Sequence, residues 1–114
     1  MIMDDLPCLD ALDDTALDQL PFGVVRLDRA GRIERFNAPE AARSGIQRWR
    51  ALGRNYFRDV APASRELALR VEQLPPGACA SIAHTFRGFH REDRAVIEMT
   101  RADDGHVWLL IRAA

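Results

Sequence analysis

The chain contains no lysine: all sixteen basic residues are arginines, and none of them occurs in the first twenty residues, which carry six aspartates. The formal net charge is −1, and acidic residues interleave with the arginines in the rest of the chain. A nucleic-acid-binding protein presents a basic stripe or patch, and this pattern has none. We therefore expect no nucleic-acid partner.

Cysteine is also scarce. Cys8 and Cys79 lie far apart and form no CxxC pair, so we expect no disulfide. The three histidines, His84, His90 and His106, have no recognised zinc-binding spacing with Cys79. The sequence therefore predicts no metal site.

Long apolar runs and targeting signals are missing as well. No run approaches the roughly 20 apolar residues of a membrane span, and the N-terminus lacks the basic start and apolar stretch of a secretory signal. A glycine-rich phosphate loop and a GxSxG nucleophile motif are absent. We expect a cytoplasmic domain that is not an enzyme and has no membrane partner. Its 114 residues fit one domain.

The acidic N-terminal segment places leucines among its aspartates. This pattern predicts one or two short amphipathic helices within residues 4–20, the second starting near Asp13–Thr15 with an acid-rich first turn. Helices of this length are not stable alone, so they must pack on something, and the candidate is an exposed sheet face. We therefore expect an N-terminal helical cap over residues 1–20 and a core over residues 21–114.

The core is predicted to begin with a β-hairpin, with strands at 22–28 and 32–36 around a turn that contains Gly31. Asn37 then has the form of a helix N-cap, with Glu40 three residues later. Further helices are expected in the middle of the chain. They cover residues 37–44, 47–52, 55–60 and 65–74, with Ser64 capping the last of them and Pro75 ending it.

Period-two alternation takes over after residue 80 and predicts three strands, 81–89, 94–101 and 106–112. The last strand is apolar on both faces, so both faces should be covered. The middle helices can cover one face and the N-terminal helices the other. The predicted fold class is α+β: a five-stranded antiparallel sheet with short helices on one face and an N-terminal helical cap on the other.

Two motifs resemble the photoactive yellow protein family of PAS domains. The stretch that runs from Leu20-x-Phe22-Gly23 through Leu27-Asp28 and Gly31-x-Ile33 to Asn37-Ala38-x-Glu40 is similar to the start of that fold. Residues 53–62, GRNYFRDVAP, match the family's GxNFFxDVAP segment almost residue for residue. The resemblance implies a PAS sensor, with the first hairpin joined to the last strand of the sheet.

In that family the next residue is the cysteine that carries a p-coumaroyl thioester, and here it is Ala63. Alanine has no nucleophile, so the thioester cannot form there. We expect no covalent chromophore. Neither Cys8 nor Cys79 stands in a position to replace that cysteine.

The resemblance also implies which residues would border a ligand cavity. In the family a tyrosine and a glutamic acid both donate hydrogen bonds to the chromophore phenolate. Glu40 matches that glutamic acid, whereas Phe36 replaces the tyrosine. Ser44 replaces a supporting threonine, and Ile46 replaces an arginine that gates the pocket. The candidate ligand-binding set is Phe36, Glu40, Ser44, Ile46, Tyr56, Ala63 and Phe86.

Several interpretations stay open. Glu40 is either a buried acid with a raised pKa or a solvated capping-box residue. His84 and His90 share a strand face with Phe86 and are candidates for haem ligation, although histidines at such positions more often form hydrogen bonds at a sheet margin. Tyr56, Phe57 and Phe86 either surround a cavity or fill the core. Trp49 and Trp108 are expected to be packing residues.

Two functions follow from these features. The first is a sensor that binds an unidentified small molecule without a covalent bond and relays the signal by displacing residues 1–20. The second is a ligand-free PAS module that forms a homodimer or docks on a regulatory protein.

Overall fold

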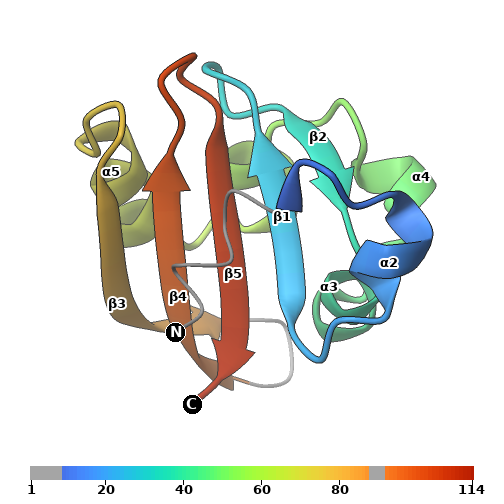
Figure 1. Ribbon diagram of the computed structural model, residues 1–114. Coiled ribbons are helices and arrows are strands. Elements are labelled where there is room, and N and C mark those ends of the chain that lie inside the picture. The colour runs from blue at the N-terminus through green and yellow to red at the C-terminus, as the bar shows by residue number, and fades with distance from the viewer. Residues whose placement is uncertain (1–8, 88–91) are drawn as a thin grey trace.

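The computed structural model describes residues 9–87 and 92–114. Five strands form one antiparallel sheet in the order β2-β1-β5-β4-β3 (Figure 1). The first hairpin is therefore joined to the last strand, as the resemblance implies. The strands are β1 Gly23–Leu27, β2 Ile33–Phe36, β3 Cys79–Arg87, β4 Glu92–Arg101 and β5 Val107–Ala113.

The register of β5 explains how the two ends of the chain form one sheet. Val25 of β1 lies opposite Leu109 of β5, and Met99 of β4 lies opposite Leu109 on the other side. Residues 107–111 of β5 are all buried, because this strand is central in the sheet and both of its faces are covered. The prediction that both faces of the last strand are covered is confirmed.

The helices that follow the first hairpin lie behind the sheet in Figure 1, apart from the helix at residues 48–51, which lies beside the β2 edge. They cover a core of alternate residues from the strands, including Val25, Ile97, Met99 and Leu109. The middle helices are α3 Ala38–Ser44, α4 Arg48–Ala51, η2 Tyr56–Val60 and α5 Arg65–Glu72.

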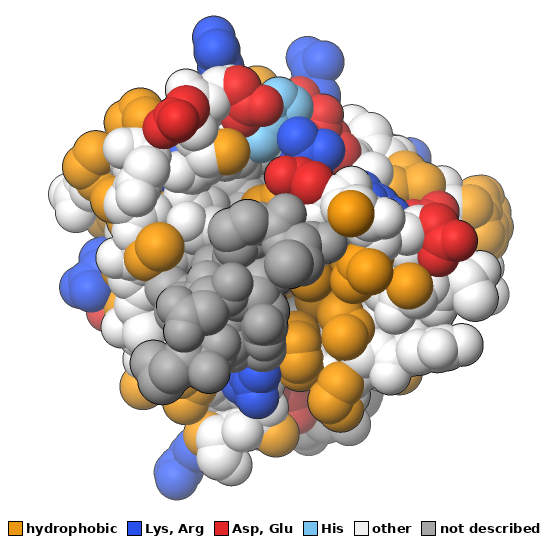
Figure 2. Space-filling view, viewed as in Figure 1, with side chains coloured by type: hydrophobic (Ala, Val, Ile, Leu, Met, Phe, Trp, Pro, Cys, Tyr) orange, Lys and Arg blue, Asp and Glu red, His pale blue; other side chains and the backbone are white. Residues whose placement is uncertain are grey.

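The opposite face of the sheet carries a second apolar cluster. Leu9 and Leu17 pack there with Val24, Trp108 and Leu110. Leu17 belongs to α2 Asp14–Asp18, whose N-cap is Asp13, so the helix starts within the predicted range. Figure 2 shows hydrophobic side chains gathered on this face beside α2. The part of the predicted cap before Leu9 lies outside the described residues.

Three local predictions are wrong in detail. Residues 56–60 form a π-helix, closed by a hydrogen bond from Ala61 N–H to Tyr56 O at 2.8 Å, where an ordinary helical turn was expected. Ser64 precedes α5 but makes no capping bond with its hydroxyl. Trp49 is 72% exposed and not a packing residue, because α4 is only one turn long and presents it to solvent.

Two other predictions concern Trp108 and membrane insertion. Trp108 is buried under the N-terminal segment, as expected. Within residues 9–87 and 92–114, no helix has both the length and the apolar character that crossing a bilayer requires.

Candidate functional site

The candidate site is organised by Asn37, which joins three parts of the fold. Its side-chain oxygen accepts hydrogen bonds from Glu40 N–H at 3.2 Å, as a helix N-cap, and from Val24 N–H of β1 at 2.8 Å. Its amide nitrogen donates to the carbonyls of Leu17 and Phe22 at 2.8 and 3.0 Å. The side chain is 1% exposed, so these bonds form away from water. Asn37 thereby connects α3, β1 and the N-terminal cap.

Glu40 projects from the first turn of α3 into the interior, where it is 0% exposed. Its two oxygens accept from the Arg43 guanidinium, from Nε at 2.8 Å and from a terminal nitrogen at 2.5 Å. The Tyr56 hydroxyl donates to the same carboxylate at 3.5 Å. Glu40 is therefore a buried acid, and the alternative of a solvated capping-box residue is wrong. We call Glu40, Arg43 and Tyr56 the buried polar cluster.

Burial dominates the electrostatics of this cluster. It raises the pKa of the Glu40 carboxyl above the ordinary value, while the Arg43 guanidinium opposes that change. Burial also acts to lower the pKa of Arg43, but the Glu40 carboxylate outweighs it and raises that pKa. The pKa of Tyr56 lies well above its ordinary value because the phenol is buried. The Tyr56 hydroxyl therefore keeps its proton and donates to Glu40.

Gly23 makes room for the Glu40 carboxyl. A Cβ at position 23 would lie 2.6 Å from Glu40 Oε1 and 3.2 Å from Glu40 Cβ. Both of these distances are shorter than ordinary contacts between such atoms. The glycine at this position is needed because the acid packs directly against the β1 backbone.

We therefore predict that Gly23→Ala destabilises the fold by about 2 kcal/mol, because the methyl group must displace a buried acid that Arg43 holds in place. Urea unfolding of the wild type and the variant measures this change. The control is Gly45→Ala, which has φ +76° but open space around its Cβ. It should cost only about 1 kcal/mol, from backbone strain. Equal losses in the two variants would contradict the close-approach argument.

Phe86 completes the site from β3. Its ring is 7% exposed, and the Arg43 guanidinium carbon lies 3.9 Å from the ring centroid. The His84 ring packs edge-on against it, with centroids 4.9 Å apart. Arg43 thus contacts both Glu40 and Phe86, two of the positions that the resemblance assigns to ligand contact. Arg43 is absent from the candidate set, although its i,i+3 spacing from Glu40 was a usable signal.

Phe36 and Tyr56 occupy the helix-covered core. Phe36 is 2% exposed, and its ring carries no hydroxyl. Tyr56 approaches Glu40 from η2 and supplies a hydroxyl to the acid from a different element. Asn55 is the N-cap of the π-helix, and its side-chain oxygen accepts from the N–H groups of Phe57 and Arg58 at 3.1 Å.

The remaining predicted site residues lie further out. Ser44 accepts a 3.3 Å bond from Ile46 N–H through its hydroxyl. Ile46 lines a separate cavity of about 310 Å³ together with Arg50 and Val60. Ala63 is exposed and borders a cavity of about 430 Å³ that His84 also lines. The structure thus brings Glu40, Tyr56 and Phe86 together through Arg43 and places Ala63 on another cavity.

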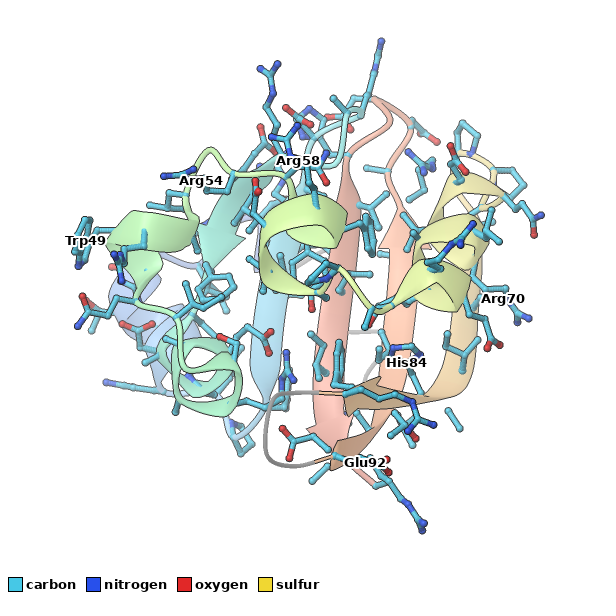
Figure 3. The ribbon with its side chains drawn as sticks, turned by 180° about the vertical axis from the view of Figure 1, so that it is seen from behind. Trp49, Arg54, Arg58, Arg70, His84 and Glu92 are labelled. Carbon is cyan, nitrogen blue, oxygen red and sulfur yellow. The ribbon has the colours of Figure 1, made fainter. Side chains whose placement is uncertain are left out.

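His84 is half-buried between α5 and the sheet (Figure 3). Its Nε2 forms a 2.9 Å hydrogen bond with the hydroxyl of Ser64, which explains why that hydroxyl does not cap α5. Burial lowers the pKa of His84, which favours the neutral ring. Ligation of haem iron through Nε2 would cost this bond, and His90 lies outside the described residues. Among the residues that the structure describes, no group of three or more His, Cys, Asp or Glu residues could hold a metal ion.

Comparison with known proteins bears on the family and the fold of the chain. No family model matches the chain. It is 37% identical to photoactive yellow protein of Halochromatium salexigens over 54 residues, 47% of this chain and 43% of that relative. The match therefore spans less than half the length of this curated relative.

Solved structures match nearly the whole chain. The photoactive yellow protein domain of the sensor histidine kinase Ppr from Rhodospirillum centenum superposes with a TM-score of 0.76 and 26% identity, covering 93% of this chain and 97% of that domain. The PAS domain of an HTR-like protein from Haloarcula marismortui has a TM-score of 0.68 and 14% identity, covering 98% and 97%. This second likeness concerns the fold alone.

Proposed function

Since the chain is a photoactive yellow protein-like PAS domain, we propose that it senses a small molecule that binds without a covalent bond on the helix-covered side of the sheet. The proposed contact region is the buried polar cluster with Phe86. The set proposed from the sequence also includes Phe36, Ser44, Ile46 and Ala63, of which Ile46 and Ala63 line other cavities. The domain would act as a cytoplasmic regulatory module and not as an enzyme.

The observation that carries this proposal is the hydrogen bonding of Asn37. Its side chain holds the N–H of Glu40 and the carbonyl of Leu17, which lies in the N-terminal cap. Asp18 of the same cap accepts from Ala38 N–H at 2.8 Å and from Arg48. A ligand that shifts α3 therefore changes the bonds that hold the cap. Displacement of the cap would expose the second apolar cluster to a partner.

Native mass spectrometry of protein purified from its own host tests ligand retention, and hydrogen exchange tests the relay. We expect a bound mass, and faster exchange of the amides in residues 9–20 in the ligand-bound protein than in the stripped protein. Two results together would contradict the proposed sensing. The purified protein would retain no ligand, and no metabolite fraction from the host would change the hydrogen-exchange rate of residues 9–20.

A second candidate function is a protein–protein interaction module. Trp49 of α4 projects away from the sheet (Figure 3), and Leu52 beside it is 42% exposed. Tryptophan is enriched at interface hot spots, because a large ring buries much area at small entropic cost. A homodimer or a complex with a regulatory protein would use this surface.

For this candidate we predict that Trp49→Ala weakens self-association without weakening the fold. Because the ring is 72% exposed, the free energy of unfolding should change by less than about 0.5 kcal/mol. Sedimentation velocity measures the shift from dimer to monomer. The control is Leu69→Ala, a 54% exposed leucine on α5 that should leave association unchanged. A wild type that is monomeric at all concentrations would rule the dimer out.

A further inference from the structure

A cavity lies between the turn of the first hairpin, η2 and α5. Its lining includes residues 28–31 of the turn, Phe57 of η2 and Ala68 of α5, and we call it the hairpin cavity. Its volume is about 270 Å³, and a space of roughly 150 Å³ can already hold a benzene ring. The three members of the buried polar cluster are not among the described residues that line it. The hairpin cavity is therefore a separate place in the fold.

The inner wall of the hairpin cavity is apolar. Leu27 of β1, Val107 of β5 and Val71 of α5 line it, and all three are buried members of the core on the helix-covered side of the sheet. Phe57 adds an aromatic ring to the same lining. An apolar molecule placed against this wall would be stabilised, because both surfaces leave water.

The charged residues around the hairpin cavity show no excess of either sign. Two guanidinium groups, those of Arg29 and Arg101, line it with two carboxylates, those of Asp28 and Glu72. The two guanidinium groups already donate to backbone carbonyls, Arg29 to one and Arg101 to three, at 2.6 to 2.8 Å. The Asp104 carboxylate lies further out and interacts with two arginines, Arg29 among them. An ion that left water for this space would meet charges of both signs, so a neutral molecule is favoured.

Asp28 and Asn55 supply hydrogen-bonding groups at one end of the cavity. Asp28 Oδ1 accepts from the N–H groups of Ala30 and Arg32 at 2.8 and 2.9 Å, whereas Asp28 Oδ2 has no hydrogen-bond partner among the described residues. The Asn55 amide nitrogen carries two N–H groups and donates one bond, to Ala30 O at 3.0 Å. Both side chains thus bond the backbone of Ala30, so the remaining acceptor and the remaining N–H lie at the same end. A hydroxyl group suits both of them, because it donates and accepts.

We propose that the hairpin cavity binds a small neutral alcohol, with its hydroxyl at Asp28 and Asn55 and its apolar body against the inner wall. This site goes beyond the proposed sensing function, because it takes a different ligand at a different place. Binding there can still influence the buried polar cluster. The Phe57 ring packs edge-on against the Tyr56 ring, with centroids 5.1 Å apart, and the Tyr56 hydroxyl donates to the buried acid.

Benzyl alcohol is the probe for this site. Benzylamine and benzoate are its cationic and anionic analogues at pH 7, and toluene is the analogue that lacks the hydroxyl. Titration of the full chain, followed through the amide chemical shifts in NMR spectra, should show benzyl alcohol binding at least about threefold more tightly than each analogue. The largest shifts should fall in residues 28–31, 55–57 and 68–72, which surround the cavity.

Two substitutions fill the cavity from α5. Ala68 is half-buried and lines the cavity, so Ala68→Leu and Ala68→Met place a larger side chain in space that the ligand needs. Each should weaken benzyl alcohol binding by about tenfold or more. Urea unfolding of both variants verifies that the fold is kept. The control is Ala83→Leu on β3, which narrows the separate cavity of about 430 Å³ and should leave binding unchanged.

The outcomes separate the parts of this proposal. Benzylamine or benzoate binding as tightly as benzyl alcohol overturns the neutral class of the ligand, and toluene doing so overturns the role of Asp28 and Asn55. Failure of benzyl alcohol to bind, shifts that centre elsewhere, or unchanged binding in folded Ala68 variants overturns the site. An equal loss in Ala83→Leu does so too. The proposed sensing function is decided separately, by the ligand-retention measurement.

Discussion

Replacement of Asn37 by alanine should destabilise the protein by about 3 kcal/mol, because it leaves buried backbone groups without partners. The N–H groups of Val24 and Glu40 lose their acceptor, and the Phe22 carbonyl loses the amide donor. The Leu17 carbonyl also loses it and keeps only the Leu20 N–H, at 3.3 Å. Buried unsatisfied groups each cost about 1–3 kcal/mol, and some relaxation or water entry reduces the sum. Urea unfolding measures the loss, and hydrogen exchange should show residues 9–20 opening more often than in the wild type.

The control for Asn37 is Asp13→Ala. Asp13 is also a helix N-cap, but its bond to Ala16 N–H is exposed, at 2.9 Å. That change should cost about 1 kcal/mol or less. If the two variants lose equal stability, Asn37 acts only as a cap and does not connect the three elements. Unchanged exchange in residues 9–20 of Asn37→Ala would contradict its link to the cap.

The second large effect is expected for Arg43→Met. The change removes the cation from a carboxylate that is 0% exposed, and breaking one side of a buried ion pair costs about 3–5 kcal/mol. Because the Arg43 side chain itself is 20% exposed, we expect a loss of about 3 kcal/mol, at the lower end of that range. Urea unfolding at pH 8 measures it.

The loss in Arg43→Met should shrink as the pH falls. Burial already raises the folded-state pKa of Glu40 above its unfolded value, and removal of the guanidinium raises it further. A raised folded-state pKa means that the folded state binds a proton more tightly. Stability is therefore retained at acidic pH and is lost as the pH rises through the folded-state pKa. The loss of unfolding free energy in Arg43→Met relative to the wild type should be smaller at pH 5 than at pH 8.

The double variant Glu40→Gln/Arg43→Met provides the matched control. It removes both charges, so no buried charge is left without a partner, and it should be more stable at pH 8 than Arg43→Met alone. Its pH dependence should also be weaker, since the titrating acid is absent. A single variant whose deficit is the same at both pH values would contradict the buried-acid account of Glu40.

Some of this site could be predicted from local sequence. The Asn37-x-x-Glu40 spacing, with Pro39 between, indicates a helix start, and the structure has an N-cap there with the expected bond to Glu40 N–H. Gly45 ends the helix in the left-handed conformation, at φ +76°, where a glycine is favoured. These features depend on a few adjacent residues, so they can be predicted from the local sequence.

Other features depend on contacts between distant residues. The i,i+3 spacing indicates Arg43 as the partner of Glu40. The burial of Glu40, however, depends on Gly23 and Tyr56, which lie 17 and 16 positions away from it in the chain. The exposure of Trp49 follows from how α4 is placed and not from the apolar character of the ring. The π-helix at residues 56–60 also escaped prediction, because no local pattern distinguishes it from an α-helical turn.

The amino-acid sequence by itself determined the five strands, the order of the helices and the resemblance to a PAS sensor. Alternation, helix caps and motifs each involve residues that are close together in the chain, so they can be recognised without the structure. The tertiary structure alone decided that Glu40 is buried and bonded by Arg43 and Tyr56, and that Asn37 reaches the N-terminal cap. Both arrangements arise where α3 packs against β1. Charge pairing and burial at such a contact depend on the distances between elements, which no single stretch of the chain specifies.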